Sequence, residues 1–306
     1  MIIECFSPKN KAQWRQYYHF RWQILRAPWQ QPQGSEQDEL EDQAIHRMLV
    51  NEKGDILGVA RLHFTTQYQA QIRYTAVKEN VRGQGLGKRL IAELEHQALL
   101  RGAKSIYLNA RELAIRFYED LGYQLGDLSH VLYAQLKHFS MNKQLTGLPN
   151  NNLNVIYALQ QKWYQTIPVS QAMNIAICYY DGVTMVSHCD PVFNKNLHNT
   201  MFAGSIYTLA TLSGWGWVYL YLLERNLQGD IVLANATIKY VAPIKGIVAA
   251  KTSKDLVEVK SNSVKPSQKI RICVSVEVFS GDNVAALFTG DYVVTQPDCM
   301  TENTKT

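Results

Sequence analysis

The feature that most constrains the fold is a long segment without charge. No Asp, Glu, Lys or Arg occurs from Asn199 to Leu223, and a helix of that length would suffice to cross a bilayer. The segment is rich in small and polar residues, and basic residues do not flank it on one side. We therefore expect a helix buried in the core of a domain and no insertion into a membrane.

Strand signals surround this helix in the second half of the chain. Residues 270–279 alternate between apolar and polar side chains, which indicates an antiparallel sheet with one buried face. Other strands are expected at 175–180, 183–188, 231–241, 247–252 and 284–294, and a helix at 155–165. One long apolar helix among several antiparallel strands predicts a sheet that is wrapped around the helix.

The first half of the chain has a different pattern, in which helix and strand signals alternate. The expected helices are 11–26, 87–101 and 113–121, and the expected strands are 44–51, 56–65, 71–77, 105–108 and 131–136. Residues 140–153 are polar, contain Gly, Pro and a run of Asn, and have turn composition. We therefore predict an α+β protein of two domains, 1–139 and 154–306, joined by a linker at 140–153.

Charge and cysteine content narrow the functional classes. The formal net charge is +5, from 31 Lys and Arg against 26 Asp and Glu, and neither half is basic enough for a nucleic-acid-binding protein. The five cysteines are scattered and form no CxxC pair, which argues against a metal site and a disulfide framework. A reducing cytoplasm is the simplest setting. The N-terminal residues show no signal-peptide pattern.

A glycine-rich segment, Arg82–Lys88, follows the strand expected at 71–77 and leads into a helix. Glycines let the backbone approach a ligand closely, and loop N–H groups with a helix N-terminus form a cradle suited to a pyrophosphate. The spacing excludes a Walker A loop, because Arg89 follows Lys88, and a Rossmann fingerprint, because Lys88 occupies the position of the last glycine. Spacing alone fits a structural turn equally well.

Two motifs together suggest a family for the first half. The pattern Arg82-x-x-Gly85-x-Gly87 after a strand resembles motif A of the GNAT acyltransferases, and Ala114–Tyr123 resembles their motif B. The resemblance covers about residues 1–139 and implies a GNAT fold that uses acetyl-CoA as substrate, without a metal. It implies that the cofactor-binding residues are Val77, Arg82, Gly83, Gln84, Gly85, Leu86, Gly87 and Lys88.

The same resemblance suggests a catalytic acid for acetyl transfer. Tyr118 matches the tyrosine that protonates the departing CoA thiolate, a role that a phenol can fill. Many family members carry Asn where this chain has Arg111, so the pantetheine contacts at that position are expected to differ. The acetyl acceptor is expected to be an amine of unknown identity. By residue type alone the general base has several candidates, and we assign none of them: Glu41, Asp42, His46, His63 and Tyr74.

A second polar cluster, Asp190–Ser205, leads into the uncharged helix. Free N–H groups at a helix N-terminus can stabilise an oxyanion, although a capped loop explains the cluster equally well. The segments Gly204–Thr211 and Tyr240–Pro243 resemble the central helix and a following strand of the hot-dog fold of acyl-thioester enzymes. Thioesterases of this type usually carry an acid on that helix, where this chain has Thr211. The missing carboxylate argues against simple hydrolysis.

The stretch Asn196–Gly204, with Gly214-Trp215-Gly216, resembles the malonyl-ACP decarboxylase family, including its bifunctional form with an N-terminal GNAT domain. That resemblance places the essential amide on Asn196, with Gly204 as the helix N-terminal donor. It implies an acyl carrier protein as partner and acetyl-ACP as product for fatty acid synthesis. A hot-dog sheet leaves an exposed edge that is commonly paired with a second copy, so we expect a homodimer formed through the second domain. Two alternatives stay open: an acyl-CoA or acyl-ACP thioesterase, and a non-catalytic acyl-thioester sensor.

An acyl carrier protein is acidic, so a basic surface would favour its docking. Basic residues cluster late in the chain, interrupted by Asp255 and Glu258, and the cluster comprises Lys251, Lys254, Lys260, Lys265, Lys269 and Arg271. A solvated lysine-rich loop is the simpler explanation for the same residues.

Overall fold

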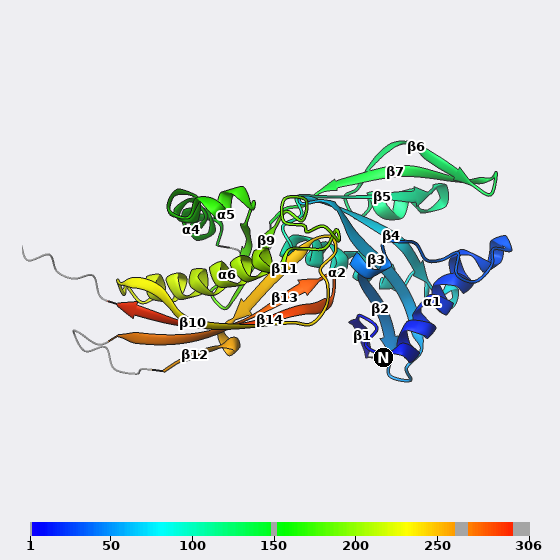
Figure 1. Ribbon diagram of the computed structural model, residues 1–306. Coiled ribbons are helices and arrows are strands. Elements are labelled where there is room, and N and C mark those ends of the chain that lie inside the picture. Colours follow the sequence, from blue (N-terminus) through cyan, green and yellow to red (C-terminus); the bar gives the residue numbers. More distant parts are fainter. Residues whose placement is uncertain (1, 148–151, 261–268, 296–306) are drawn as a thin grey trace, which may run out of the picture. The chain divides into compact units, whose positions relative to one another are not determined.

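The computed structural model describes residues 2–147, 152–260 and 269–295. The chain divides into two compact units. The N-terminal unit comprises Met1–Asn151 with the short segments Lys245–Ile247 and Gly281–Asn283, and the C-terminal unit comprises Asn152–Ile244, Val248–Ser280 and Val284–Thr306. Each unit has its own sheet (Figure 1).

The N-terminal unit is built on a seven-stranded sheet with the order β1-β2-β3-β4-β5-β7-β6. Neighbouring strands are antiparallel except β4 and β5, which are parallel. The strands are β1 (Ile3–Phe6), β2 (Ile45–Asn51), β3 (Ile56–Thr66), β4 (Gln69–Val77), β5 (Ser105–Arg111), β6 (Gln124–Leu132) and β7 (Leu136–Gln144).

Helices cover both faces of this sheet. Helix α2 (Leu86–Leu100) buries Leu90, Ile91 and Leu94 in one core cluster, which also contains Leu49 of β2. Helix α1 (Lys11–Leu25) packs in a second cluster with Met48, the neighbour of Leu49 in the same strand. Successive strand residues point to opposite faces, so α1 and α2 lie on opposite sides of the sheet. Short helix α3 (Ile115–Glu119) follows β5.

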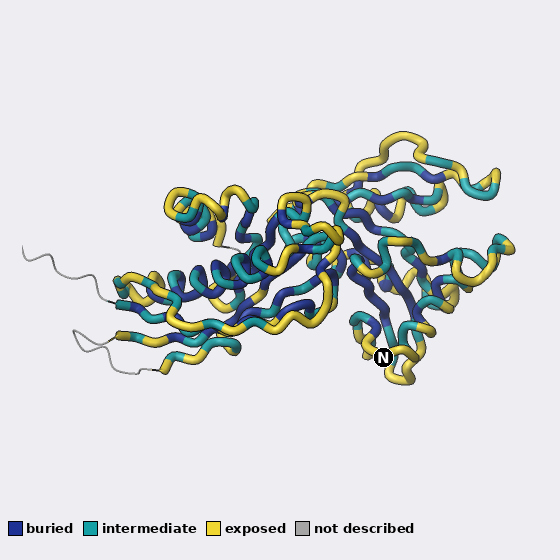
Figure 2. Tube along the Cα trace, viewed as in Figure 1, coloured by how far each residue is buried: buried dark blue, intermediate teal, exposed yellow. Residues whose placement is uncertain are grey.

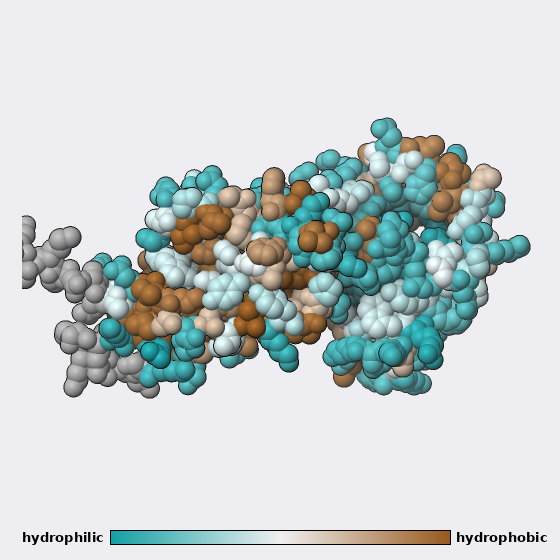
Figure 3. All heavy atoms as spheres, in the orientation of Figure 1, coloured by the Kyte–Doolittle hydropathy of each residue, from teal (hydrophilic) through white to brown (hydrophobic). Residues whose placement is uncertain are grey.

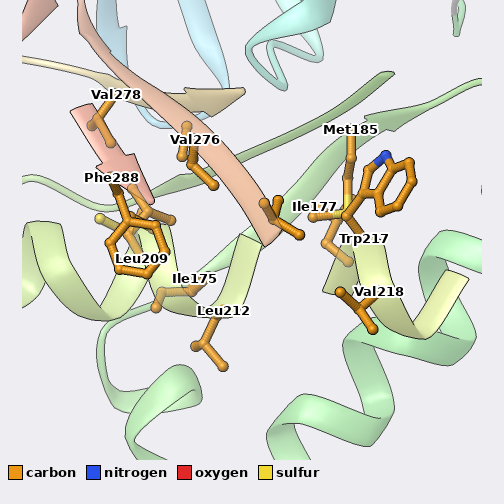
Figure 4. Close-up of a cluster of buried hydrophobic side chains, with 14 of the residues drawn as sticks. Ile175, Ile177, Met185, Leu209, Leu212, Trp217, Val218, Val276, Val278 and Phe288 are labelled. Carbon is orange, nitrogen blue, oxygen red and sulfur yellow. The ribbon is translucent and has the colours of Figure 1, made fainter. Parts of the chain in front are cut away.

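The C-terminal unit confirms the predicted buried helix. Helix α6 (Ala203–Glu224) has buried residues along its length, among them Leu209, Ser213 and Val218. No helix in the described part of the chain is long and apolar enough to span a membrane. The sheet packs against this helix through β9, β10, β11 and β13, and Figure 4 shows apolar side chains of α6 among those of the strands. In Figure 2, buried residues recur along α6 and the strands beside it.

The sheet of the C-terminal unit is antiparallel, with the order β10-β14-β13-β11-β9-β8 and with β12 paired to β13. Two further helices, α4 and α5, precede it, and α4 packs against β8. The elements are α4 (Leu153–Thr166), α5 (Pro168–Ala172), β8 (Ala176–Tyr180), β9 (Thr184–Cys189), β10 (Asp230–Tyr240), β11 (Val248–Ser253), β12 (Val257–Val259), β13 (Ile270–Ser280) and β14 (Asn283–Thr295).

One predicted strand was wrong. The sequence predicted a strand at 131–136, but Tyr133 and Ala134, with φ of 53° and 59°, form the turn between β6 and β7. The signal was weak because β6 is almost entirely exposed and therefore lacks an apolar face. The elements β1, α5 and β12 were not predicted, and all three are short. Strand β7 continues to Gln144, into the segment predicted as a linker, whose residues 148–151 lie outside the described part.

Candidate active site

A cavity of about 800 Å³ opens in the N-terminal unit. It is lined by the second half of β4, residues 81–88, the end of β5 and α3, together with the end of α1 and the β6–β7 hairpin. The predicted cofactor-binding residues that line it are Val77, Arg82, Gly83, Gly85, Leu86, Gly87 and Lys88. Gln84 is not among the lining residues and is exposed.

The cavity opens where β4 and β5 stop pairing. Their parallel register runs from Gln69 opposite Ser105 to Ile72 opposite Leu108, although β4 continues to Val77 and β5 to Arg111. Residues of both strands beyond that point line the cavity. Backbone N–H and C=O groups that face such a gap need hydrogen-bond partners, so the gap suits an extended ligand that carries amides.

A bulge in β4 accompanies this separation. The register with β3 shifts between Val59 and Arg61, and Tyr74 has a φ of 56°, which is strained for a residue with a side chain. The Tyr74 hydroxyl donates to Asp38 Oδ2 at 3.2 Å, and the Arg21 guanidinium lies 4.1 Å from the ring centre. These contacts hold the strained residue in place, and a bulged strand bends locally.

The glycine loop is suited to bind an anion. Gly83 and Gly85 have φ of 77° and 80°, and a Cβ atom at either position would meet nothing within 4 Å. Gly85 precedes the first turn of α2, which has no side-chain cap. The first N–H groups of a helix lack partners within the helix and attract anions. Lys88 adds positive charge beside them.

Tyr118 lies on α3 and is 7% exposed. Burial raises the pKa of its hydroxyl above the ordinary value of 10, with Thr75 as a hydrogen-bonding neighbour that lowers it in part. The phenol is therefore protonated at neutral pH. Both Tyr118 and Thr75 line the cavity, so this site holds a proton donor beside the glycine loop.

Of the five candidates for the general base, only Tyr74 lines the cavity. Glu41 forms buried ion pairs with Arg21 and Arg61. His46 and His63 are buried, and burial lowers the pKa of each to about 4. The Asp42 side chain is exposed to solvent. The structure thus separates most of these residues from the cavity.

A histidine that was not predicted from the sequence lines the cavity. His138 on β7 is 8% exposed, and its Nδ1 lies 3.0 Å from the Leu136 carbonyl. Burial lowers the pKa of His138 despite that contact, and the nearby positive charges of Arg111 and Arg26 lower it further. Its ring stacks on His130 across the hairpin, with centres 4.6 Å apart. A neutral imidazole that donates through Nδ1 leaves Nε2 as a proton acceptor. No local motif marks this residue. The strand predicted at 131–136 ended before His138, which lies on β7.

In the C-terminal unit, Asn196 and the start of α6 lie side by side. The Phe202 N–H donates to the Asn194 carbonyl at 2.7 Å, and Lys195 forms a β-bridge with Met201. The Asn196 Nδ2 donates to Thr200 Oγ1 at 3.1 Å, and its Oδ1 accepts from the His198 N–H at 2.9 Å. An amide nitrogen has two N–H groups, so Asn196 retains one for a ligand.

Gly204 lies in the first turn of α6, where backbone N–H groups lack helical partners. Thr211 follows two turns later, and its carbonyl accepts from the Tyr292 hydroxyl at 2.7 Å. The Thr211 hydroxyl oxygen is buried without a hydrogen bond among the described residues. This helix therefore presents amide and hydroxyl groups, and the sequence from Pro191 to Leu223 contains no Asp or Glu.

Comparison with known proteins gives one family match in each of the two compact units. The model of the "Acetyltransferase (GNAT) family" matches residues 14–123, and the model of the family described as "Putative thioesterase (yiiD_Cterm)" matches residues 156–296. The chain is 28% identical over 135 residues to the "Uncharacterized N-acetyltransferase YjcF" of Bacillus subtilis (strain 168), a match that covers 44% of this chain and 95% of that protein.

Solved structures resemble each half. The crystal structure of a "putative thioesterase" from Shewanella oneidensis is 37% identical, with a TM-score of 0.42, and covers 47% of this chain and 98% of its own. An aminoglycoside 6'-N-acetyltransferase complexed with coenzyme A is 19% identical, with a TM-score of 0.42, and covers 49% of this chain and 99% of its own.

The family matches confirm the predicted α+β architecture of two domains, the first with the GNAT fold and the second with the hot-dog fold. The chain is an acyl-thioester enzyme that joins a domain of the acetyltransferase (GNAT) family, at residues 14–123, to a domain of the family described as putative thioesterase, at residues 156–296.

Proposed function

We propose that the N-terminal domain transfers an acetyl group from acetyl-CoA to a primary amine. One observation carries the proposal: the glycine loop, the gap between β4 and β5 and the buried Tyr118 all line a single cavity. In this proposal the loop N–H groups and Lys88 bind the pyrophosphate, and the strand edges pair with the amides of pantetheine. The thioester then lies within the cavity that contains the proton donor.

The proposed reaction needs a nucleophile and two proton transfers. The amine nitrogen attacks the acetyl carbonyl carbon, a C–N bond forms, and the C–S bond breaks. The CoA thiolate takes its proton from the Tyr118 hydroxyl, which is a general acid. His138 Nε2 is suited to accept the proton that the amine loses, since His138 is neutral at neutral pH.

The first prediction tests the glycine loop. Gly85→Val places a branched side chain in the space through which the pyrophosphate approaches, so acetyl-CoA affinity should fall at least about tenfold. Gly54→Val is the matched control, because Gly54 has a φ of 83° and equally open surroundings but does not line the cavity. Calorimetry on both folded variants measures the effect. Equal affinities for the two variants would place the CoA site elsewhere.

The second prediction concerns Tyr118. Tyr118→Phe removes the proton donor and keeps the buried ring, so kcat should fall roughly 10²-fold or more while the KM for acetyl-CoA changes little. Because burial raises the pKa of Tyr118, the acid form persists as pH rises, and wild-type kcat should not decline below about pH 10 through this group. Steady-state release of CoA thiol measures both. An unchanged kcat in the variant would remove Tyr118 from the mechanism.

We propose for the C-terminal domain the decarboxylation of a malonyl thioester, with malonyl-ACP as substrate. A hydrolase needs a carboxylate to activate water, and α6 has none at the position of Thr211. In the proposed step the bond between the carboxylate and the methylene carbon breaks, CO₂ leaves, and the resulting enolate takes a proton to give acetyl-ACP. The Asn196 amide and the Gly204 N–H would stabilise the enolate oxygen. The product would serve fatty acid synthesis in the cytoplasm.

The third prediction separates decarboxylation from hydrolysis. Asn196→Asp puts a negative charge beside the substrate carboxylate and the enolate, so decarboxylation should fall roughly 10²- to 10³-fold, the usual effect of losing an oxyanion donor. Asn199→Asp is the matched control in the same loop, at an exposed residue. Mass spectrometry of the carrier protein after reaction distinguishes malonyl-ACP, acetyl-ACP and free ACP. Retained decarboxylation would exclude Asn196, and increased hydrolysis would favour the thioesterase.

We further propose that the C-terminal domain forms a homodimer that completes this site. Strand β10 ends the strand order and pairs with β14 alone within the described sheet, and an unpaired edge favours association. Figure 3 shows hydrophobic residues on the surface of this unit. Exposed apolar residues in the loop before α6 and on β10 are Val192, Phe193, Leu197, Phe202 and Val232.

The fourth prediction follows from that surface. Light scattering at micromolar concentration should give the mass of two chains for the wild-type protein. The Val232→Lys substitution on β10 should shift the measured mass toward that of a single chain. The substitution adds charge at an exposed residue and leaves the buried core intact. A wild-type protein with the mass of one chain would contradict the dimer.

We propose an acyl carrier protein as the partner that delivers the thioester. The basic residues predicted for its docking are exposed at Lys251, Lys254, Lys269 and Arg271. Lys260 is also exposed, and its Nζ lies 3.4 Å from Asp291 Oδ1, whereas Lys265 lies outside the described residues. The exposed members provide a surface of suitable charge for an acidic carrier.

A further inference from the structure

Two arginines in the wall of the N-terminal cavity lack an acidic partner. Arg26 and Arg111 both line the cavity, and no carboxylate within the described ranges lies at ion-pair distance from either. The other arginines near Tyr74 differ, because carboxylates bind them: Arg21 pairs with Glu41, Arg61 with Asp38 and Glu41, and Arg73 with Asp38.

The two unpaired arginines lie close to one another. Arg111 Nη2 lies 3.5 Å from the carbonyl oxygen of Leu25, the residue before Arg26. Burial lowers the pKa of Arg111, and the positive charges of Arg26 and Arg82 lower it further. Half-buried like charges repel one another, so this arrangement favours a bound anion.

Both arginines have N–H groups that make no hydrogen bond to the described residues. Arg26 uses its Nε for the carbonyl of Ser35 at 2.9 Å, and its terminal nitrogens make no hydrogen bond to the described residues. Arg111 makes the single long contact with Leu25. A guanidinium presents five N–H donors in a planar fork that matches the two oxygens of a carboxylate.

The wall that carries these arginines is held rigidly. The β6–β7 turn keeps Tyr133 and Ala134 in the left-handed region, a strain that persists only where surrounding contacts fix it. The Tyr133 ring stacks on Trp29, three residues after Arg26, with centres 5.9 Å apart. On the other side, Arg111 pairs in register with His138 of β7. The end of α1, the end of β5 and the hairpin therefore form one wall of the cavity.

This wall is distinct from the anion cradle already described. The glycine loop and Lys88 belong to the start of α2, whereas Arg26 ends α1 and Arg111 ends β5. The cradle has its own backbone donors for the CoA pyrophosphate. The second pair of positive charges is therefore free for the other substrate.

We propose that the amine that accepts the acetyl group carries a carboxylate, and that Arg26 and Arg111 bind this carboxylate. The inference rests on the proposed acetyl transfer and names its substrate class. Binding the carboxylate at the wall would fix the acceptor at one end and leave its amino group to reach the thioester near Tyr118.

The test compares acceptors that differ only in charge. The full-length protein is assayed with acetyl-CoA and a panel of L-amino acids, β-alanine and γ-aminobutyrate, each against its carboxamide, with phosphoethanolamine as the alternative anion. We expect kcat/KM for the best acid to exceed that for its amide by at least about tenfold, the usual contribution of a hydrogen bond to a charged group. Equal rates for acid and amide, or a preference for phosphoethanolamine, would overturn the proposal and leave acetyl transfer intact.

Substitutions of the two arginines test whether they cause the preference for the carboxylate acceptor. Arg111→Gln and Arg26→Gln should each raise the KM for the acid about tenfold or more, abolish the preference over the amide, and leave the KM for acetyl-CoA within about twofold. Arg111→Lys should restore part of the preference because it keeps the charge. Arg15→Gln, at an exposed residue of α1 outside the cavity, is the matched control, and Lys88→Gln should instead raise the KM for acetyl-CoA.

Two results would count against the assignment. A change in the KM for acetyl-CoA with unchanged acceptor preference in Arg111→Gln would place that arginine on CoA and overturn the carboxylate site. Failure of the wild-type protein to bind acetyl-CoA by calorimetry would instead overturn acetyl transfer itself, and the acceptor site with it.

Discussion

The separation of β4 from β5 is the feature on which the N-terminal site depends. Pairing ends at Ile72 and Leu108, and beyond that point the backbone groups of β4 that point away from β3, and those of β5 that point away from β7, face a gap. Leaving such groups without partners costs about 1–3 kcal/mol each when they are buried. The bulge at Tyr74 bends β4 on its other side, and the contacts of Asp38 and Arg21 with Tyr74 hold the bulge. The fold thus maintains an opening that an amide-containing ligand can fill.

The C-terminal domain depends on a different constraint, the burial of a helix that carries no charged residue before its last position. A charged residue in the middle of α6 would have to be paired or neutralised within the core. The sequence avoids that cost, and Ser213 satisfies its hydroxyl by donating to the Leu209 carbonyl at 2.7 Å. The consequence for chemistry is that from Ala203 to Leu223 this helix offers only neutral side chains and backbone N–H groups. Its one carboxylate, Glu224, is the last helical residue and accepts a hydrogen bond from the Tyr180 hydroxyl. Neutral groups can stabilise a negative charge but cannot deprotonate water, which is why the proposed reaction is a decarboxylation.

The sequence predicted those features that depend on local pattern. The glycine loop, the amphipathic α2 and the apolar α6 each extend over one continuous segment, and the structure places them as expected. The cationic wall of the cavity was not predictable in this way, because Arg26, Arg111 and His138 come from three elements that meet only in the folded sheet. The exposed strand β6 gave no periodic signal, so the hairpin that carries His138 was misplaced. Asp38, which holds the bulge, lies in a loop without any motif.

Hydrogen–deuterium exchange with and without acetyl-CoA reports on the backbone groups that we propose bind the ligand. We expect slower exchange at the amides of residues 82–90 and at the strand edges 73–77 and 108–111, with unchanged exchange in α6. Protection that is absent from both the loop and the strand edges, in a protein that binds acetyl-CoA, would contradict the proposed binding.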